Sequence, residues 1–168
     1  MMLRRLFLLV TSIVSVSAAN AATMFLPGNS GVPDAFYGGG IGCVPEAASG
    51  VMRTIPPPGS ANNDCLVSYP INLPTGSTID GVEIAYRDDS NGSGRSIAAY
   101  LAKHVINPFD TYPIAVAGTN DLIVSPESQS LFMNMGPLNV AIGAGAIYWV
   151  QVSMHRVTQV QYVSVKYH

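Results

Sequence analysis

The sequence has 168 residues, of which 11% are charged and 48% are hydrophobic, and its formal net charge at pH 7 is −2. A mildly acidic chain without a cluster of Lys or Arg lacks the concentrated positive surface that nucleic acids and anionic membranes require, so both are excluded as partners. The charged fraction is well under the roughly 25% of ordinary soluble domains, which favours a surface that packs against a polymer or another copy of the chain.

The N-terminal residues 1–21 have the pattern of a cleavable signal peptide. A short basic segment precedes an apolar stretch at 6–16, which gives way to a run of Ala, Ser and Asn. The stretch is shorter than the roughly 20 residues that cross a bilayer. We expect cleavage after Ala21, with Ala19 as the alternative, and a secreted or periplasmic chain that has no further membrane attachment. Cleavage removes two basic residues and leaves a net charge of −4.

The rest of the chain has the size of one domain. Its two cysteines, Cys43 and Cys65, are the only ones in the sequence. In an oxidising compartment we expect them to form a disulfide, which is worth roughly 3 kcal/mol in the chain-entropy model. Pro and Gly recur so often between 22 and 64 that we expect an irregular arm with only short strands there. The disulfide would tie this arm to a β domain at 65–168.

After the second cysteine, apolar runs of strand length alternate with turn residues, and no helical spacing is found. The runs predict seven strands, at 66–73, 78–87, 96–104, 114–117, 129–135, 146–154 and 159–167. Short strands in this number predict an all-β fold, a single antiparallel β-sandwich of jelly-roll or immunoglobulin-like type.

Two of the connections between these runs predict hairpins. The polar, Gly-rich segment 88–94 has the turn residues that a hairpin between the second and third runs needs. The segment 155–158 predicts a second hairpin between the last two runs. Gly81 interrupts the second run and indicates a β-bulge. The apolar row of that run comprises Ile79, Val82, Ile84 and Tyr86.

Trp149 is the one tryptophan of the chain. The continuous apolar row of its strand comprises Tyr148, Val150, Val152 and Met154. Side chains alternate along a strand, so Trp149 and Gln151 fall on the other face. We expect the Pro-rich arm or a second copy to cover Trp149. The alternative is a glycan site made of Trp149, Gln151 and Tyr100, in which the indole stacks on a sugar ring and the amide reaches its hydroxyls.

The loop after the second run carries side-chain oxygens at Asp88, Asp89 and Asn91, and Gly92 follows them. This pattern resembles the first half of an EF-hand calcium loop, which would imply a weak calcium site. The closing carboxylate of such a loop would fall at Tyr100, which supplies none. We therefore expect a plain turn, with calcium as the alternative, and no other cofactor.

The final run, 160–168, alternates and ends with a penultimate Tyr167, as in the subunits of chaperone-assembled pili, which it resembles. That resemblance implies assembly into a polymer. His155 stands where those subunits have a glycine, and the N-terminal segment 23–26 stops at Pro27, too short for a donor strand. An ordinary last strand of a sandwich is the preferred interpretation.

No segment carries a catalytic set of residues, and glycoside chemistry would need two acids that face one cleft. Asp80 and Glu83 lie too near the start of a strand to argue this from sequence. We expect a secreted, non-enzymatic β-sandwich that acts as a binding or structural module outside the cell. The alternatives are a carbohydrate-binding module centred on Trp149, a pilus-like subunit that associates with itself, and a small hydrolase with an unrecognised site.

Overall fold

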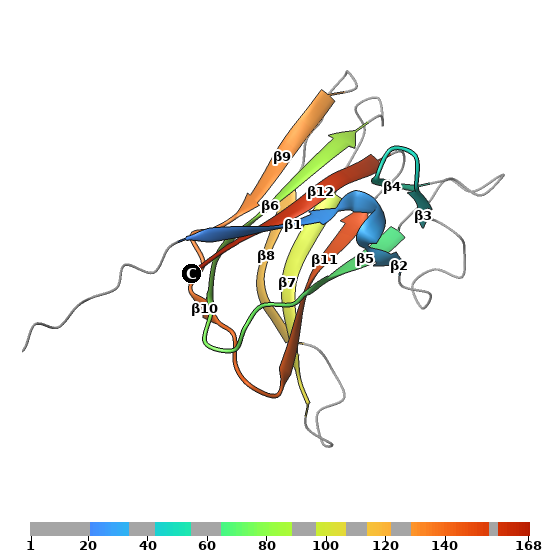
Figure 1. The fold of residues 1–168 in the computed structure, drawn as a ribbon. Coiled ribbons are helices and arrows are strands. Elements are labelled where there is room, and N and C mark those ends of the chain that lie inside the picture. Colours follow the sequence, from blue (N-terminus) through green and yellow to red (C-terminus); the bar gives the residue numbers. More distant parts are fainter. Residues whose placement is uncertain are drawn as a thin grey trace, which may run out of the picture.

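The structure is a computed structural model of the chain, and it describes residues 21–33, 43–54, 65–88, 97–106, 114–121, 129–154 and 158–168. These residues form two antiparallel sheets that face each other (Figure 1). Sheet A contains β1 (Ala22–Pro27), β3 (Cys43–Glu46), β4 (Val51–Thr54), β6 (Thr78–Asp88), β9 (Gln129–Met135), β10 (Val140–Ala141) and β12 (Thr158–Tyr167). Sheet B contains β2 (Val32–Pro33), β5 (Cys65–Ile71), β7 (Ile97–Val105), β8 (Ile114–Asp121) and β11 (Ala146–Met154).

The principal strands pair in a nested order, from the outside of the sequence inwards. β1 pairs with β12, β5 with β11, β6 with β9, and β7 with β8. The first and third of these pairs belong to sheet A, and the second and fourth to sheet B. A long antiparallel hairpin rolled over two sheets in this way is a jelly roll. The β-sandwich prediction is confirmed, and its type is the jelly roll.

Each of the seven predicted strands is present, but both predicted hairpins are wrong. β6 lies in sheet A and pairs with β12, β9 and β10, whereas β7 lies in sheet B and pairs with β11 and β8. β11 and β12 are likewise in different sheets. The same polar turn residues suit a connection between strands of different sheets and a hairpin within one sheet. The alternation of a strand reports which of its faces is buried, and it does not report the hydrogen-bonded neighbour.

The core fills the space between the two sheets. β11 shows the predicted alternation, with buried residues at every second position from Tyr148 to Met154. The largest fully buried side chains include Tyr69, Tyr86, Met52, Ile79, Ile84, Ile97, Leu101 and Met154. The sandwich is therefore held by apolar rows that both sheets contribute.

The bulge expected at Gly81 is present in β6, at the step from Asp80 to Gly81. Gly81 is opposite Lys166 and Ile79 is opposite Tyr167, so Asp80 is an extra residue in the ladder. The bulge explains why Ile79 and Val82, three positions apart, are both buried. It also turns the Asp80 side chain away from the core.

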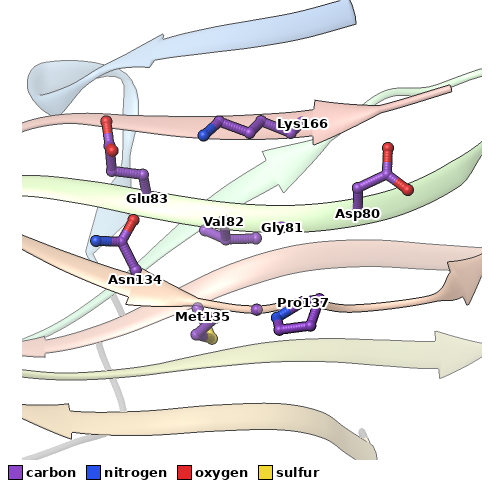
Figure 2. A pocket seen from close by; sticks show the side chains of 9 residues that line it. Asp80, Gly81, Val82, Glu83, Asn134, Met135, Pro137 and Lys166 are labelled. Carbon is purple, nitrogen blue, oxygen red and sulfur yellow. The ribbon is translucent and has the colours of Figure 1, made fainter. Parts of the chain in front are cut away.

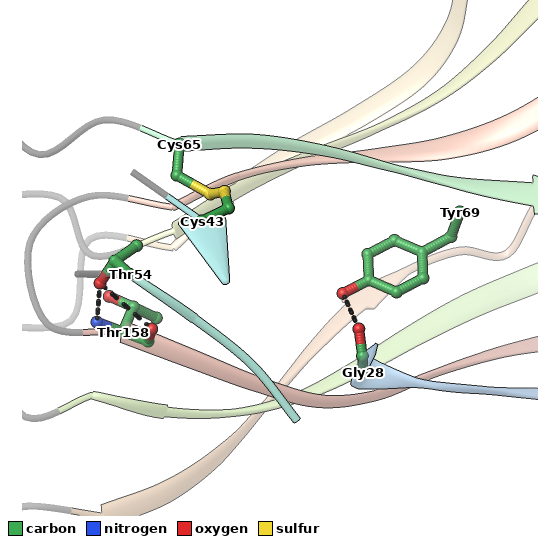
Figure 3. Close-up of a disulfide and its surroundings, with 6 residues drawn as sticks. All are labelled: Gly28, Cys43, Thr54, Cys65, Tyr69 and Thr158. Carbon is green, nitrogen blue, oxygen red and sulfur yellow. Dashed lines mark hydrogen bonds between the residues drawn. A yellow bond between two sulfur atoms is a disulfide. The ribbon is translucent and has the colours of Figure 1, made fainter. Parts of the chain in front are cut away.

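The N-terminal arm connects the two sheets. Its strand β1 begins at Ala22, and a 3-10 turn, η1 (Gly28–Ser30), leads from sheet A to β2 on the edge of sheet B. The Tyr69 hydroxyl of β5 donates a buried 2.9 Å hydrogen bond to the Gly28 carbonyl oxygen (Figure 3). A Cβ at position 28 would collide with the Val160 carbonyl, so only glycine fits this crossing.

The expected disulfide between Cys43 and Cys65 is present, and it joins β3 of sheet A to β5 of sheet B (Figure 3). Next to it, the Thr158 backbone N–H donates a 3.0 Å hydrogen bond to the buried Thr54 hydroxyl. The arm therefore supplies four short strands and is attached to both sheets.

Removal of the disulfide is expected to lower stability by about 3 kcal/mol, because the unfolded chain regains the freedom of the closed loop. The test is urea denaturation of a Cys43→Ala/Cys65→Ala variant. A reductant should lower the stability of the wild type to a similar degree and leave the variant unchanged. Equal midpoints for the wild type and the variant would contradict this assignment.

Tyr69→Phe is expected to lower the free energy of unfolding by about 1 to 2 kcal/mol, because the buried Gly28 carbonyl loses its hydrogen-bond donor. Urea denaturation at neutral pH measures this difference.

Burial also raises the pKa of Tyr69 above the usual value of about 10. The unfolded chain then loses this proton at a lower pH than the folded chain, so the associated stability is complete below pH 10 and is lost above it. Denaturation between pH 8 and 11 should show a smaller fall in stability for Tyr69→Phe than for the wild type.

Candidate functional site

The outer face of sheet B carries the three residues that the sequence proposes for a glycan site. Trp149 is partly exposed on the outward side of β11, opposite Pro70 of β5 and Ala102 of β7. Both neighbours have small side chains, so no large side chain lies directly opposite the indole on either adjacent strand. Trp149 is therefore neither fully buried nor fully exposed on this face.

Gln151 and Tyr100 lie directly opposite each other on β11 and β7, next to Trp149 on the same face. Ser68 is opposite Gln151 on the other side. We call this surface the Trp149 face, and it comprises Ser68, Pro70, Tyr100, Ala102, Trp149 and Gln151. Outward positions of 66–70, 98–104 and 147–153 hold no Asp, Glu, Lys or Arg. The Trp149 face is thus an uncharged, aromatic and hydrogen-bonding surface.

The outer face of sheet A contains a pocket that sequence reasoning missed. It has a volume of about 230 Å³ and is drawn in Figure 2. The lining residues come from β6, β9, β12 and the turn after β9, and they are Asp80, Gly81, Val82, Glu83, Asn134, Met135, Gly136, Pro137 and Lys166. We call it the Gly81 pocket. Four of its residues carry polar side chains that can meet one ligand.

Register explains how these distant residues meet. Glu83 of β6 is opposite Asn134 of β9 on one side, and Gly81 is opposite Lys166 of β12 on the other. A Cβ at position 81 would lie 3.3 Å from the Met135 carbonyl oxygen. Because position 81 has no side chain, the space above the sheet stays open at this point.

The two carboxylates of the Gly81 pocket already have partners. Asp80 accepts contacts from His168 Nδ1 at 2.8 and 3.0 Å. Glu83 Oε1 accepts a 3.3 Å hydrogen bond from the Tyr162 hydroxyl. Burial raises the pKa of Tyr162 above its usual value, and the charge and hydrogen bond of Glu83 raise it further. Both acids are held in place at the surface.

A second bulge places Tyr162 on the outer face of sheet A, where its hydroxyl reaches Glu83. Val160 is opposite Tyr86 and Tyr162 is opposite Ala85, so Gln161 is an extra residue in β12. Tyr162 therefore faces outward, where its ring meets Phe25 of β1 edge-on at 5.8 Å between centroids. An aromatic rim thus extends from Glu83 across β12 to β1.

The calcium prediction lies outside the described residues. Asp89 and Asn91 fall in the undescribed segment 89–96, and the side chain of Asp88 is not described either. Within the described ranges, no group of three His, Cys, Asp or Glu side chains could hold a metal ion. In the same part of the chain, no helix has the length and apolarity to cross a bilayer.

No protein-family model and no curated protein matches this sequence. Among solved structures, TmCBM61 in complex with beta-1,4-galactotriose is similar at 12% identity and a TM-score of 0.29, over 62% of this chain and 59% of that one. The infectious bursal disease virus Gx strain structure is similar at 14% identity and a TM-score of 0.32, over 88% and 31%. The chain spans less than two thirds of either protein. The fold assignment rests on the strand pairing.

Proposed function

We propose that this protein is a secreted, non-enzymatic module that binds a polysaccharide through the Trp149 face. The observation that supports this most directly is the partly exposed indole on an uncharged sheet face, with Gln151 and Tyr100 beside it. The disulfide and the expected signal peptide support an oxidising location outside the cytoplasm.

The chemistry of the Trp149 face suits a sugar better than an ion or a nucleic acid. An aromatic ring offers an apolar surface to the C–H groups of a pyranose, and it loses little conformational entropy on binding. The Gln151 amide both donates and accepts hydrogen bonds, as sugar hydroxyls require. The directly opposite neighbours, Pro70 and Ala102, are smaller than the indole, so neither places a large side chain beside the ring.

Trp149→Ala is expected to weaken retention on an insoluble polysaccharide by about tenfold or more, which corresponds to at least about 1.4 kcal/mol. The measurement is a depletion isotherm on cellulose, chitin, mannan and peptidoglycan. Gln151→Ala should weaken the same isotherm by a smaller factor. Phe132→Ala is the matched control, since Phe132 is 57% exposed but lies on sheet A.

Two results would count against this proposal. One is a wild-type protein that no polysaccharide of the panel retains. The other is a folded Trp149→Ala variant that is retained as well as the wild type and the Phe132→Ala control.

A glycoside hydrolase is the second candidate, because the Gly81 pocket brings two carboxylates to one hollow. Hydrolysis needs one acid that donates a proton and a second that acts as base or nucleophile. Here Asp80 is bound to His168 and Glu83 to Tyr162, which favours a role in holding a ligand.

We expect the wild type to release no reducing ends from the same polysaccharides during a prolonged incubation. The measurement is a reducing-sugar assay, with Glu83→Gln as the matched variant. Release that Glu83→Gln abolishes would replace the binding module by a hydrolase.

A further inference from the structure

We infer that the Gly81 pocket is a second binding site, which takes one neutral, polyhydroxylated unit such as a single sugar residue. It lies on the outer face of sheet A, whereas the Trp149 face belongs to sheet B. The inference stands on its own residues and does not depend on the proposed function.

The polar groups of the pocket offer both donors and acceptors. Glu83 accepts hydrogen bonds, the Asn134 amide donates and accepts them, and the Lys166 ammonium donates them. Figure 2 shows the Glu83 and Asp80 carboxylates on the same side of the sheet, with the Lys166 side chain along β12 between them. A hydroxyl can donate to one of these groups while it accepts from another. A molecule with several adjacent hydroxyls uses the whole set.

The charges of the pocket disfavour simple ions. The Lys166 ammonium lines the same pocket as the carboxylates of Asp80 and Glu83, and Asp80 also contacts His168. An anion that approaches Lys166 meets the Glu83 carboxylate, and a cation that approaches Glu83 meets the Lys166 ammonium. A neutral ligand meets neither repulsion and contacts both groups.

The size and walls of the pocket limit the ligand to one unit. Its volume of about 230 Å³ is below the roughly 300–1,000 Å³ of sites for drug-sized ligands. Pro137 provides an apolar wall, which suits the C–H groups of a sugar while the polar groups take its hydroxyls. Tyr162, which is bonded to Glu83, and the exposed Phe25 beside it lie outside the lining of the pocket.

The experiment is an NMR titration of the 15N-labelled protein with glucose, galactose, mannose and N-acetylglucosamine, each added separately. We expect at least one sugar to give saturable chemical-shift changes at Gly81, Lys166 and the Asn134 side-chain amide.

Gly81→Leu should abolish the changes at Lys166 and Asn134, because the leucine side chain fills the pocket. Asn134→Ala should weaken binding by about threefold to tenfold, and it is the alternative variant if Gly81→Leu does not fold. Trp149→Ala is the control and should leave the shifts unchanged.

Three results would overturn the inference. The first is the absence of saturable shifts at the pocket with every sugar. The second is saturable shifts confined to the Trp149 face, which would support the proposed function and reject the pocket. The third is binding of phosphate, calcium or glycine betaine at Gly81 in place of the sugars, since it would show that the pocket selects charge.

Discussion

Every strand of this domain has to present one row of side chains to the space between the sheets, because burial of these rows stabilises the sandwich. The two central strands of sheet A meet this demand only with a bulge in each. Ile79 and Val82 are three positions apart, as are Val160 and Val163, yet all four are buried. An extra residue between the members of each pair lets both members point into the core. The extra residues also change which side chains point to the outer face of sheet A.

The same two bulges explain why the Gly81 pocket is where it is. Asp80 is the extra residue of β6, and its carboxylate points to the outside, where His168 binds it. Gln161 is the extra residue of β12, and it shifts Tyr162 to the outer face, where the phenol reaches Glu83. Gly81 follows the first bulge and leaves the hollow open. A constraint on the core has therefore shaped the polar chemistry of the surface.

Much of the local structure could be predicted from the sequence, because period-two alternation and turn residues are local signals. They located the strands, placed Trp149 on the outward side of β11, and indicated the irregularity near Gly81. The pairing of Cys43 with Cys65 followed from their number and the expected compartment. The neighbours of each strand could not be predicted, because an arch between sheets and a hairpin use the same turn residues.

The Gly81 pocket was beyond sequence reasoning for a related reason. Its polar residues, Glu83, Asn134 and Lys166, come from three strands that are distant in sequence and adjacent only in the jelly-roll order. The local signal that could have pointed to it is the three-residue spacing of buried positions in both β6 and β12. That spacing marks bulges, and bulges are frequent next to functional sites because they redirect side chains.

The two outer faces differ in chemistry, and the geometry of a sandwich separates them. Two packed sheets lie about 10 Å apart, and the buried rows of both fill the space between them. The Trp149 face and the Gly81 pocket therefore lie on opposite outer faces of the sandwich. The Trp149 face carries an aromatic ring and no charged side chain, whereas the Gly81 pocket is small and contains Glu83 and Lys166. Occupation of both would place one copy of the protein between two ligand segments, which a module with a single binding face cannot do.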